Sequence, residues 1–286
     1  MLDTSAAPPV IDDYAIVKRA IEFVSTRRRE QPSIDEVAKN AGLSPRRLEQ
    51  VLERWARLTP TAFLRAVSVE RARELLRDSA TALDAAYSVD LFGLSRPRDP
   101  LTTHQALTPG DRRRDGIVLR YGFHPSPFGE AIVVAARWGM AGLGFVDDGD
   151  RCAAHFDMIR RWPGATFRED PGATAAYAAR AFDPKLWRPD APLKLAMIGS
   201  DFDVLVWETL LRVPLGRATT YSDIARKIGK PNAARAVGAA VGRNPISFVI
   251  PCHRALGRSG ALTGYHWGLA RKKAMIAWEA GHAGGA

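Results

Sequence analysis

The chain has 286 residues, of which 46% are hydrophobic and 25% are charged, and its formal net charge is +10. This composition indicates a globular protein with room for more than one domain, and the charge indicates a polyanionic partner. No run approaches the roughly 18 apolar residues of a membrane span, no signal segment opens the chain, and two cysteines cannot build a disulfide framework. We therefore expect a cytoplasmic protein that does not contact membranes.

The N-terminal third has the pattern of short helices. Residues 1–13 lack periodicity, which predicts a flexible tail, whereas apolar residues recur at helical spacing over residues 15–26. The capping box Ser33–Glu36 predicts a second helix that ends near Gly42, and the dipeptide Ser44-Pro45 predicts the start of a third. These two helices and their glycine turn form a helix-turn-helix pattern.

The outer face of this pattern carries basic side chains suited to DNA. Arg46 and Arg47 follow the cap of the third helix, and arginine side chains bind both phosphates and guanine edges. Together with the turn Leu58–Pro60 and the helical periodicity of residues 63–76, the pattern resembles the first half of an AraC-type DNA-binding domain. The resemblance implies DNA binding by this unit, with promoter DNA as a candidate partner.

Residues 82–111 resemble the second half of the same domain. Pro97 and Pro100 interrupt the helix that should read DNA, and a proline inside a helix costs about 3 kcal/mol. We therefore predict that residues 14–115 form an all-α AraC-type domain with a degenerate second half. This departure weakens the expectation of sequence-specific operator binding.

From residue 116 the pattern changes to a mixture of strands and helices. Apolar runs predict three strands and periodic segments predict two helices, at residues 117–121, 131–135, 142–146, 153–161 and 174–181. We predict a small α/β subdomain over residues 116–198. Cys152 lies in it with only His155 nearby, which does not make a metal site.

The stretch Asn244–Arg254, which reads NPISFVIPCHR, carries a candidate nucleophile. A buried apolar run precedes Cys252, and His253 follows it directly. A neighbouring base or cation lowers the pKa of a thiol and raises the fraction of nucleophilic thiolate. The stretch therefore predicts a reactive cysteine.

The surroundings of this cysteine are strongly basic. Between Arg212 and Lys273 the chain has twelve basic residues and one acidic residue, which favours a phosphate-backbone partner. The helix predicted over residues 232–243 consists largely of alanine and glycine. Gly238 destabilises this helix by about 1 kcal/mol relative to alanine. Its presence therefore indicates that another surface must come close to the helix backbone, in part a packed helix and in part the narrow minor groove of DNA.

Several of these features share the intervals of one known family. They are the box PCHR at Pro251–Arg254, Tyr221 at a helix start, NAARAVG at Asn232–Gly238, and Gly264–Gly268. Over roughly these residues the chain resembles the methylated-DNA–protein-cysteine methyltransferases, also called O6-alkylguanine-DNA alkyltransferases. The resemblance implies a ribonuclease-H-like α/β subdomain and then a mainly α, winged-helix-like active-site domain at 199–281. With its N-terminal unit the chain resembles the bifunctional Ada-type members, without their zinc domain.

The resemblance assigns roles to five catalytic residues. Cys252 is the nucleophile, His253 is its base through a bridging water, and Glu279 orients His253. Asn244 holds the turn around the nucleophile, and Tyr221 crowds the target phosphate and donates to guanine N3. Because the product is a thioether, this S-methyltransferase acts only once.

The resemblance also implies a pocket for the substrate base. Tyr221, the carbonyl groups of Cys252 and Ala255, and the backbone of Tyr265 and His266 would form it. The side chain of His266, which is bulkier than the usual residue, should narrow the range of alkyl groups accepted.

The DNA-binding residues implied by the resemblance lie on the alanine-rich helix. Arg235 is the finger that fills the gap left by a flipped base, while Ala233, Ala234 and Gly238 allow the helix to approach the minor groove. The expected partner is double-stranded DNA containing O6-alkylguanine, with O6-methylguanine and O4-methylthymine as substrates. We expect a monomer that needs no cofactor and no metal.

Two other functions remain open at this point. An AraC-type transcriptional regulator or alkylation sensor with weak or no repair activity would bind an operator. A cysteine hydrolase would use Cys252 and His253, but it needs an oxyanion hole that the sequence does not indicate. Removal of residues 1–115 should leave methyl transfer largely intact; its abolition would mean that the N-terminal domain belongs to the active site.

Overall fold

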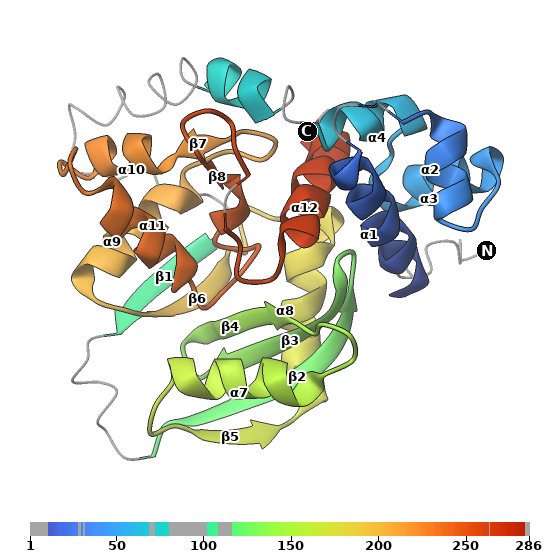
Figure 1. Ribbon diagram of the computed structural model, residues 1–286. Helices are drawn as coiled ribbons and strands as arrows, with labels where there is room; N and C mark the ends of the chain where they lie inside the picture. The colour runs from blue at the N-terminus through green and yellow to red at the C-terminus, as the bar shows by residue number, and fades with distance from the viewer. Residues whose placement is uncertain are drawn as a thin grey trace.

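The computed structural model describes residues 11–27, 30, 32–68, 72–79, 102–107, 116–262 and 264–283. These residues form an N-terminal group of helices, a six-stranded sheet covered by helices, and a C-terminal helical unit (Figure 1). One hydrophobic core runs through all three parts. None of the described helices combines the length and the hydrophobicity that a bilayer span requires.

The N-terminal group contains four helices: α1 (Ile11–Thr26), α2 (Ile34–Asn40), α3 (Pro45–Ala56) and α4 (Pro60–Ala66). The predicted capping box is present, because the side chains of Ser33 and Glu36 each accept from the other's backbone N–H. Gly42 has φ 77°, the left-handed conformation predicted after α2, and Ser44 caps α3. Leu48, which the pattern places in the core of this helix pair, is fully buried.

The structure divides the long helix predicted over residues 63–76. α4 ends at Ala66, and the N–H of Ser68 bonds to the carbonyl of Arg65, an i→i−3 bond that tightens the last turn. A further helical segment follows at residues 72–79. Of the predicted second helical unit, residues 82–111, only 102–107 lie within the described residues.

Six strands form one sheet in the order β1-β6-β4-β3-β2-β5. They are β1 (Thr102–Leu107), β2 (Val118–Ser126), β3 (Gly129–Ala136), β4 (Gly139–Phe145), β5 (Thr166–Glu169) and β6 (Leu193–Ile198). β2, β3 and β4 form an antiparallel meander, which confirms the three predicted strands. β1 corrects the all-α prediction for residues 14–115, because its backbone pairs in parallel with β6 along its whole length.

Helices α7 (Arg151–Arg161) and α8 (Pro171–Phe182) cover opposite faces of this sheet (Figure 1). Tyr121 of β2 stacks on His155 of α7 with 4.0 Å between ring centroids. A Cβ on the next residue, Gly122, would meet Thr174 of α8 at 2.5 Å. Since successive strand residues point to opposite faces, the two helices sandwich the sheet.

The C-terminal unit is mainly helical, as predicted. Its elements are α9 (Asp201–Leu211), β7 (Thr219–Thr220), α10 (Tyr221–Lys227), α11 (Ala234–Gly242), the 3-10 turn η3 (Cys252–Arg254), β8 (Ala255–Leu256) and α12 (Leu269–His282). The indole of Trp207 on α9 donates to the carbonyl of Ala240 on α11 at 2.9 Å, and β7 pairs with β8. These contacts hold α10 and α11 beside η3.

Helix α12 connects the three parts of the molecule. Arg271, only 2% exposed, donates to the carbonyl of Phe128 at 3.1 Å and pairs with Asp147 at 2.7 Å, and it lies against the ring of Tyr14. At the other end of the helix, a Cβ on Gly281 would lie 1.7 Å from the carbonyl oxygen of Ala56. The N-terminal helices are therefore packed tightly on the helix that completes the C-terminal unit.

Candidate active site

The turn before the cysteine is held by side-chain and backbone hydrogen bonds. Asn244, 3% exposed, donates from Nδ2 to the carbonyl of Ile250 at 2.9 Å and accepts from the N–H of Ile246 at 2.9 Å. The same segment is tied to β4, because the N–H of Ser247 donates to the carbonyl of Leu143 at 2.9 Å. The amide of Asn244 thus fixes both ends of a buried turn.

Phe248 occupies a strained position in this turn. Its φ is 70°, which costs a bulky L-residue roughly 1–2 kcal/mol. Packing offsets the cost, because the ring lies 4.9 Å from that of Phe128 and stacks on His253 at 5.6 Å with an interplanar angle of 15°. The left-handed conformation of Phe248 thus places its ring against the imidazole of His253.

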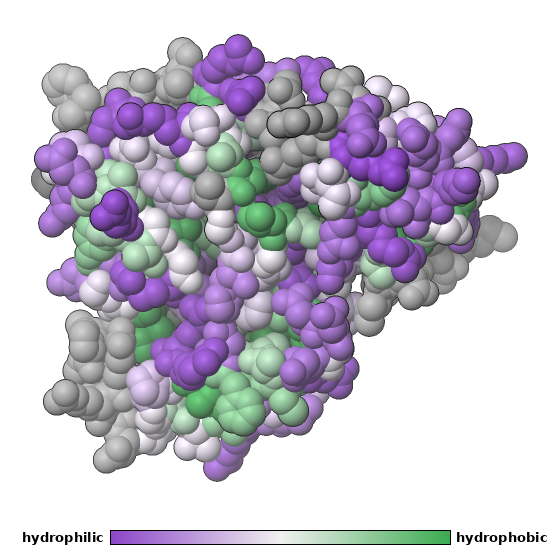
Figure 2. Space-filling model, in the orientation of Figure 1, coloured by the Kyte–Doolittle hydropathy of each residue, from purple (hydrophilic) through white to green (hydrophobic). Residues whose placement is uncertain are grey.

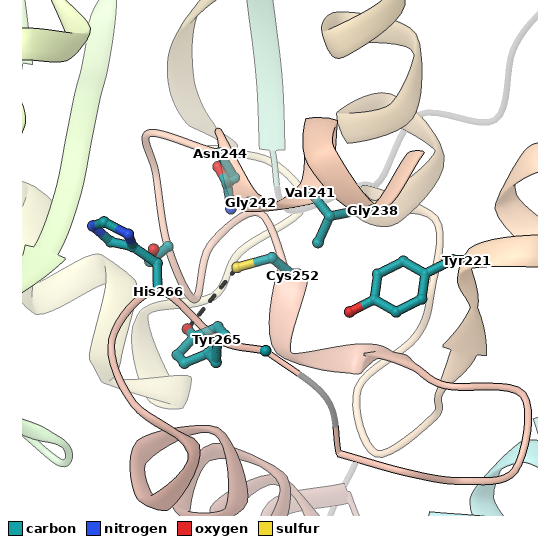
Figure 3. Close-up of a pocket in the computed structure, with 10 residues that line it drawn as sticks. Tyr221, Gly238, Val241, Gly242, Asn244, Cys252, Tyr265 and His266 are labelled. Carbon is teal, nitrogen blue, oxygen red and sulfur yellow. Dashed lines mark hydrogen bonds between the residues drawn. The ribbon is translucent and has the colours of Figure 1, made fainter. Parts of the chain in front are cut away.

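Cys252 is buried at the start of η3, with 5% of its surface exposed. Its Sγ lies 3.9 Å from the hydroxyl oxygen of Tyr265, as the dashed line in Figure 3 marks. That hydroxyl donates to the sulfur of Met275 at 3.2 Å. Burial raises the pKa of Tyr265 well above its ordinary value, and the neighbouring Cys252 raises it further, so this tyrosine stays protonated beside the sulfur.

His253 is completely buried and forms a short pair with a carboxylate. Its Nε2 lies 2.7 Å from Oε1 of Glu279, which is 1% exposed. Burial lowers the pKa of His253 and the Glu279 carboxylate opposes this, with a net decrease that favours the neutral imidazole. Nδ1 is also buried and has no hydrogen-bond partner among the described residues. One nitrogen is therefore anchored while the other remains able to exchange a proton.

A second cation completes the carboxylate's environment. Arg254 donates to Glu279 from Nε at 3.0 Å and from Nη2 at 2.7 Å, and it also donates to the carbonyl of Val213. The N–H of Gly216 donates to Oε2 at 3.2 Å. Burial raises the pKa of Glu279, but Arg254 and His253 lower it to about 2, so the group is a carboxylate at neutral pH.

Lys272 lies on the other side of the cysteine segment. It is fully buried, and its Nζ donates to the carbonyl of Ala255 at 2.7 Å. Burial lowers the pKa of this ammonium group to about 8, and Cys252 acts in the opposite direction.

Cys252 opens into a cavity of about 370 Å³. This volume lies within the range of small-molecule sites, roughly 300–1,000 Å³. The cavity is lined by Tyr221, Gly238, Val241, Gly242, Asn244, Ser247, Cys252, Gly264, Tyr265 and His266. Tyr221 faces the cysteine across it, with its hydroxyl directed inward (Figure 3). The arrangement suits a flat ligand held between a phenol and a thiol.

Of the predicted catalytic and base-pocket residues, Tyr221, Asn244, Cys252, Tyr265 and His266 line this cavity, whereas His253 and Glu279 are buried and do not line it. Ala255 is fully buried, does not line the cavity, and has its carbonyl bonded to Lys272. The ring of His266 turns away from Cys252 (Figure 3), because its Nε2 pairs with Asp157 of α7 at 3.1 Å. The geometry thus does not support the predicted narrowing of the pocket by this ring.

The predicted DNA-binding residues occupy exposed or half-buried positions. Arg235 is exposed on the first turn of α11, while Ala233 and Ala234 precede it at the helix start. Arg46 and Arg47 are exposed on the first turn of α3. Figure 2 shows hydrophilic side chains over much of the molecular face that includes α10 and the N-terminal helices.

Gly238 corrects one part of the sequence interpretation. A Cβ at this position would meet only Tyr221, at 3.8 Å, which is ordinary van der Waals contact. Packing within the protein therefore does not require glycine here. Gly238 lines the cavity at Cys252, where a methyl group would reduce the open space.

Sequence reasoning missed Lys272 and the hydroxyl of Tyr265 as neighbours of the cysteine chemistry. Tyr265 was assigned only through its backbone, and Lys272 was counted only as one of twelve basic residues. The position of Lys272 four residues after Gly268, on the first turn of α12, gives no local sign that its amine is buried. Only the packing of α12 on η3 brings it to Ala255.

The fold and the site together place a cysteine in the wall of a pocket, with a buried imidazole and carboxylate in the same unit, an arrangement found in proteins that use a thiol as a nucleophile. The family model for the DNA-binding domain of 6-O-methylguanine DNA methyltransferase matches residues 201–281. A methylated-DNA–protein-cysteine methyltransferase from Methanosarcina barkeri is 40% identical over 161 residues, which cover 56% of this chain and 97% of the relative.

The chain is also similar to a longer protein and to a protein of known structure. The regulatory protein ada of Salmonella typhimurium is 29% identical over 250 residues, or 85% of this chain and 69% of that protein. The crystal structure of Mycobacterium tuberculosis O6-methylguanine methyltransferase has 33% identity and a TM-score of 0.45, and the match covers 56% of this chain and 92% of that one. The chain belongs to the methylated-DNA–protein-cysteine methyltransferase family and is similar to an Ada protein over most of its length.

Proposed function

We propose that the protein repairs alkylated DNA by moving the methyl group of O6-methylguanine onto Cys252. The observation that carries the proposal is the pairing of His253 with Glu279 at 2.7 Å next to a cysteine that lines a pocket of about 370 Å³. A methylated guanine in duplex DNA reaches such a pocket only after it rotates out of the base stack. O4-methylthymine presents a similar alkoxy carbon and is the second substrate in this proposal.

The chemistry is an in-line substitution at the methyl carbon. His253 accepts the thiol proton through a water at Nδ1, and the Cys252 thiolate forms the new S–C bond while the C–O bond to guanine breaks. Tyr221 donates a hydrogen bond to the purine, whose ring accumulates the negative charge of the leaving group. Glu279 holds the imidazole and stabilises its protonated form. The thioether has no facile route back, so each molecule reacts once.

The DNA surface in this proposal is α11 and the start of α10. Arg235 on the first turn of α11 would fill the space left by the rotated nucleotide, since an intercalated side chain offsets lost stacking. Ala233, Ala234 and Gly238 keep the helix thin enough to enter the minor groove. The ordinary packing around Gly238 supports this, because the protein itself does not require a glycine there.

The carbonyls of Cys252 and Ala255 and the backbone of Tyr265 and His266 are the base contacts proposed from the sequence. Cys252, Tyr265 and His266 line the cavity, which supports their proposed contact with the substrate base. Ala255 would have to share its carbonyl with Lys272, which is feasible because a carbonyl oxygen has two lone pairs.

A second, regulatory function is proposed for the N-terminal helices as an AraC-type half-domain. The exposure of Arg46 and Arg47 on the first turn of α3 supports DNA contact by this helix. The similarity to a protein named as a regulator adds support. In this proposal the N-terminal helices bind DNA together with the repair site, and promoter binding is tested by comparing operator-like and random duplexes.

The deciding experiment is intact-protein mass spectrometry after incubation with a duplex that carries one O6-methylguanine. We expect the wild type to gain one methylene, about 14 Da, mapped to Cys252, and the Cys252→Ala variant to gain nothing. The exposed Cys152 provides the matched control, since Cys152→Ala should react like the wild type. An unmodified wild type that still binds the duplex would overturn repair and favour the regulatory function.

A further inference from the structure

A second recessed surface lies beside the active-site unit, between residues 72–79 and the loop after β8. This groove has a volume of about 560 Å³. It is lined by Arg73, Glu74, Leu76, Arg77, Arg258, Ser259 and Gly260. The segment 72–79 lies outside residues 201–281, the range matched by the family model, so one wall of the groove comes from the N-terminal part of the chain.

The helical segment is firmly attached to the active-site unit. Ala72 and Leu75 pack with Ala218, Leu256 and Ile276 in a small hydrophobic cluster. At the end of the segment, the hydroxyl of Ser79 accepts from the N–H of Ala218 at 3.0 Å. The segment is thus fixed against β7 and β8 and not merely near them.

The loop is shaped to fit this helix. Arg73 donates from Nε to the carbonyl of Ser259 at 3.2 Å. Gly260 has φ 76°, and a Cβ there would meet Cγ of Arg73 at 2.7 Å, so only glycine allows this approach. The two walls of the groove are therefore matched to each other.

The groove is positively charged and adjoins the base pocket. Arg73, Arg77 and Arg258 are exposed, whereas the carboxylate of Glu74 pairs with Arg65 at 3.0 Å. Arg258 reaches Ser222 Oγ at 3.5 Å, and Ser222 follows Tyr221, a wall of the cavity at Cys252. A basic surface thus continues from the pocket mouth to the segment 72–79.

We propose that this groove binds the phosphodiester backbone of the DNA strand next to the rotated nucleotide. The inference rests on the proposed function, since it places the DNA at the cavity of Cys252. Arginine side chains bind phosphate oxygens through charge-assisted hydrogen bonds and fix the register of a protein on a duplex. The N-terminal part of the chain therefore extends the DNA-binding surface of the repair site through Arg77 and its neighbours.

The test measures duplex affinity by fluorescence anisotropy for Arg77→Gln, Arg258→Gln and the matched control Arg168→Gln. Arg168 is exposed on β5, which lies at the opposite end of the molecule from β7 and β8 (Figure 1). We expect each groove variant to weaken binding about fivefold relative to the control. The slope of log affinity against log salt should decrease by about 1 for each lost phosphate contact. Groove variants that match Arg168→Gln in affinity and slope would overturn the proposal.

A modified duplex provides a sharper second measurement. Neutral methylphosphonate linkages replace the phosphates one at a time beside the O6-methylguanine. At the contacted position the neutral linkage should weaken binding by the wild type. It should not weaken binding by Arg77→Gln further, because that variant has already lost the contact between the arginine and the phosphate. If the losses of affinity from the neutral linkage and from Arg77→Gln add at every position, Arg77 does not contact any of these phosphates. Reaction with free O6-benzylguanine, which needs no DNA, should be equal in all variants. If the wild type gains no methyl group from the O6-methylguanine duplex, methyl transfer is refuted while the binding comparison still judges the groove.

Discussion

At His253 two opposing influences act on one imidazole. Burial lowers its pKa, and the carboxylate of Glu279 at 2.7 Å raises it, with burial the larger effect. A pKa below the ordinary value keeps the imidazole neutral at the pH of the cell, which a base requires. The same pairing engages Nε2, so that in the proposed mechanism Nδ1 is the nitrogen that accepts the proton.

The first prediction concerns the pH dependence of transfer. Because the neutral form of His253 persists below its ordinary pKa of 6.5, the rate should stay level as the pH falls through 6.5 and decrease only in more acidic solution. Single-turnover rates with free O6-benzylguanine measure this without DNA binding. A decrease centred at or above pH 6.5 would show that burial does not control this imidazole.

Replacing the carboxylate should separate stability from chemistry. Glu279→Gln leaves the guanidinium of Arg254 buried without a counter-charge, which costs about 3 kcal/mol or more. It also removes the group that stabilises the protonated imidazole, so the transfer rate should fall about tenfold or more. Urea unfolding and the benzylguanine rate measure the two effects. Glu130→Gln, in a surface pair with Arg151, is the control and should cost at most about 1 kcal/mol.

The acid limit of stability follows from the same carboxylate. The folded pKa of Glu279, about 2, lies below its ordinary value of 4.5, so its contribution is present above pH 4.5 and is lost as the pH falls toward 2. The stability difference between the wild type and Glu279→Gln should therefore shrink over that interval. A constant difference down to pH 2 would mean that this group does not control acid unfolding.

Arg235 allows the DNA step to be tested apart from the chemistry. It is exposed on the first turn of α11, so its loss should not disturb the fold. Arg235→Ala should slow the reaction with duplex O6-methylguanine, because the gap in the stack is no longer filled, and should leave the reaction with free O6-benzylguanine unchanged. Arg188→Ala, in an exposed pair with Asp190, is the control. Equal losses on both substrates would refute the role of a finger.

At the scale of elements, two helical glycines have opposite meanings. On α11, a Cβ at Gly238 would only touch Tyr221 at 3.8 Å, whereas on α12 a Cβ at Gly281 would lie 1.7 Å from the carbonyl oxygen of Ala56. Glycine normally destabilises a helix by about 1 kcal/mol relative to alanine. At Gly238 helix propensity favours alanine and packing tolerates it. At Gly281 helix propensity favours alanine but packing excludes it.

This contrast predicts changes of opposite sign. Gly238→Ala should raise the free energy of unfolding by up to about 1 kcal/mol and slow only the duplex reaction, because the added methyl group obstructs DNA. Gly281→Ala should lower it by about 1–3 kcal/mol, since backbone atoms must move to admit the methyl group. Gly242→Ala, with no atom within 4 Å of the new Cβ, is the control for propensity alone. A stabilised Gly281→Ala variant would contradict the tight contact of α12 with α3.

The elements that the sequence predicted best are those with local end signals. Ser33 and Ser44 both cap the helices that follow them, because a capping side chain acts on N–H groups only three residues away. β1 was not predicted, since its partner among the described strands is β6, some ninety residues later. Cys252 and the family intervals around it indicated segments that line the cavity, but the partners of His266 and Ala255 depend on contacts with α7 and α12 that leave no local pattern.

At the scale of the molecule, α12 belongs to two parts at once. Its residue Glu279 serves the site at Cys252, while Arg271 contacts Tyr14 of α1 and Gly281 contacts Ala56 of α3. The indole of Trp55 on α3 also donates to the carbonyl of Pro127 between β2 and β3 at 2.7 Å. The single core that joins these elements argues against the sequence-based expectation that methyl transfer stays largely intact when residues 1–115 are removed.

Removal of α1 to α4 tests this coupling directly. Deleting residues 1–68 keeps segment 72–79 and β1 but exposes the face of α12 that packs on α1, α3 and α4. The loss of several kcal/mol of burial should lower Tm by about 10 °C or more, given roughly 2–4 °C per kcal/mol for a domain of this size. Because Glu279 lies on the same helix, the rate with free O6-benzylguanine should also fall, although this substrate never contacts the deleted helices. A deletion of residues 1–10 alone is the control. If the shorter protein keeps both the wild-type Tm and the wild-type rate, then α12 holds the active site without the N-terminal helices, and the two parts are separate domains.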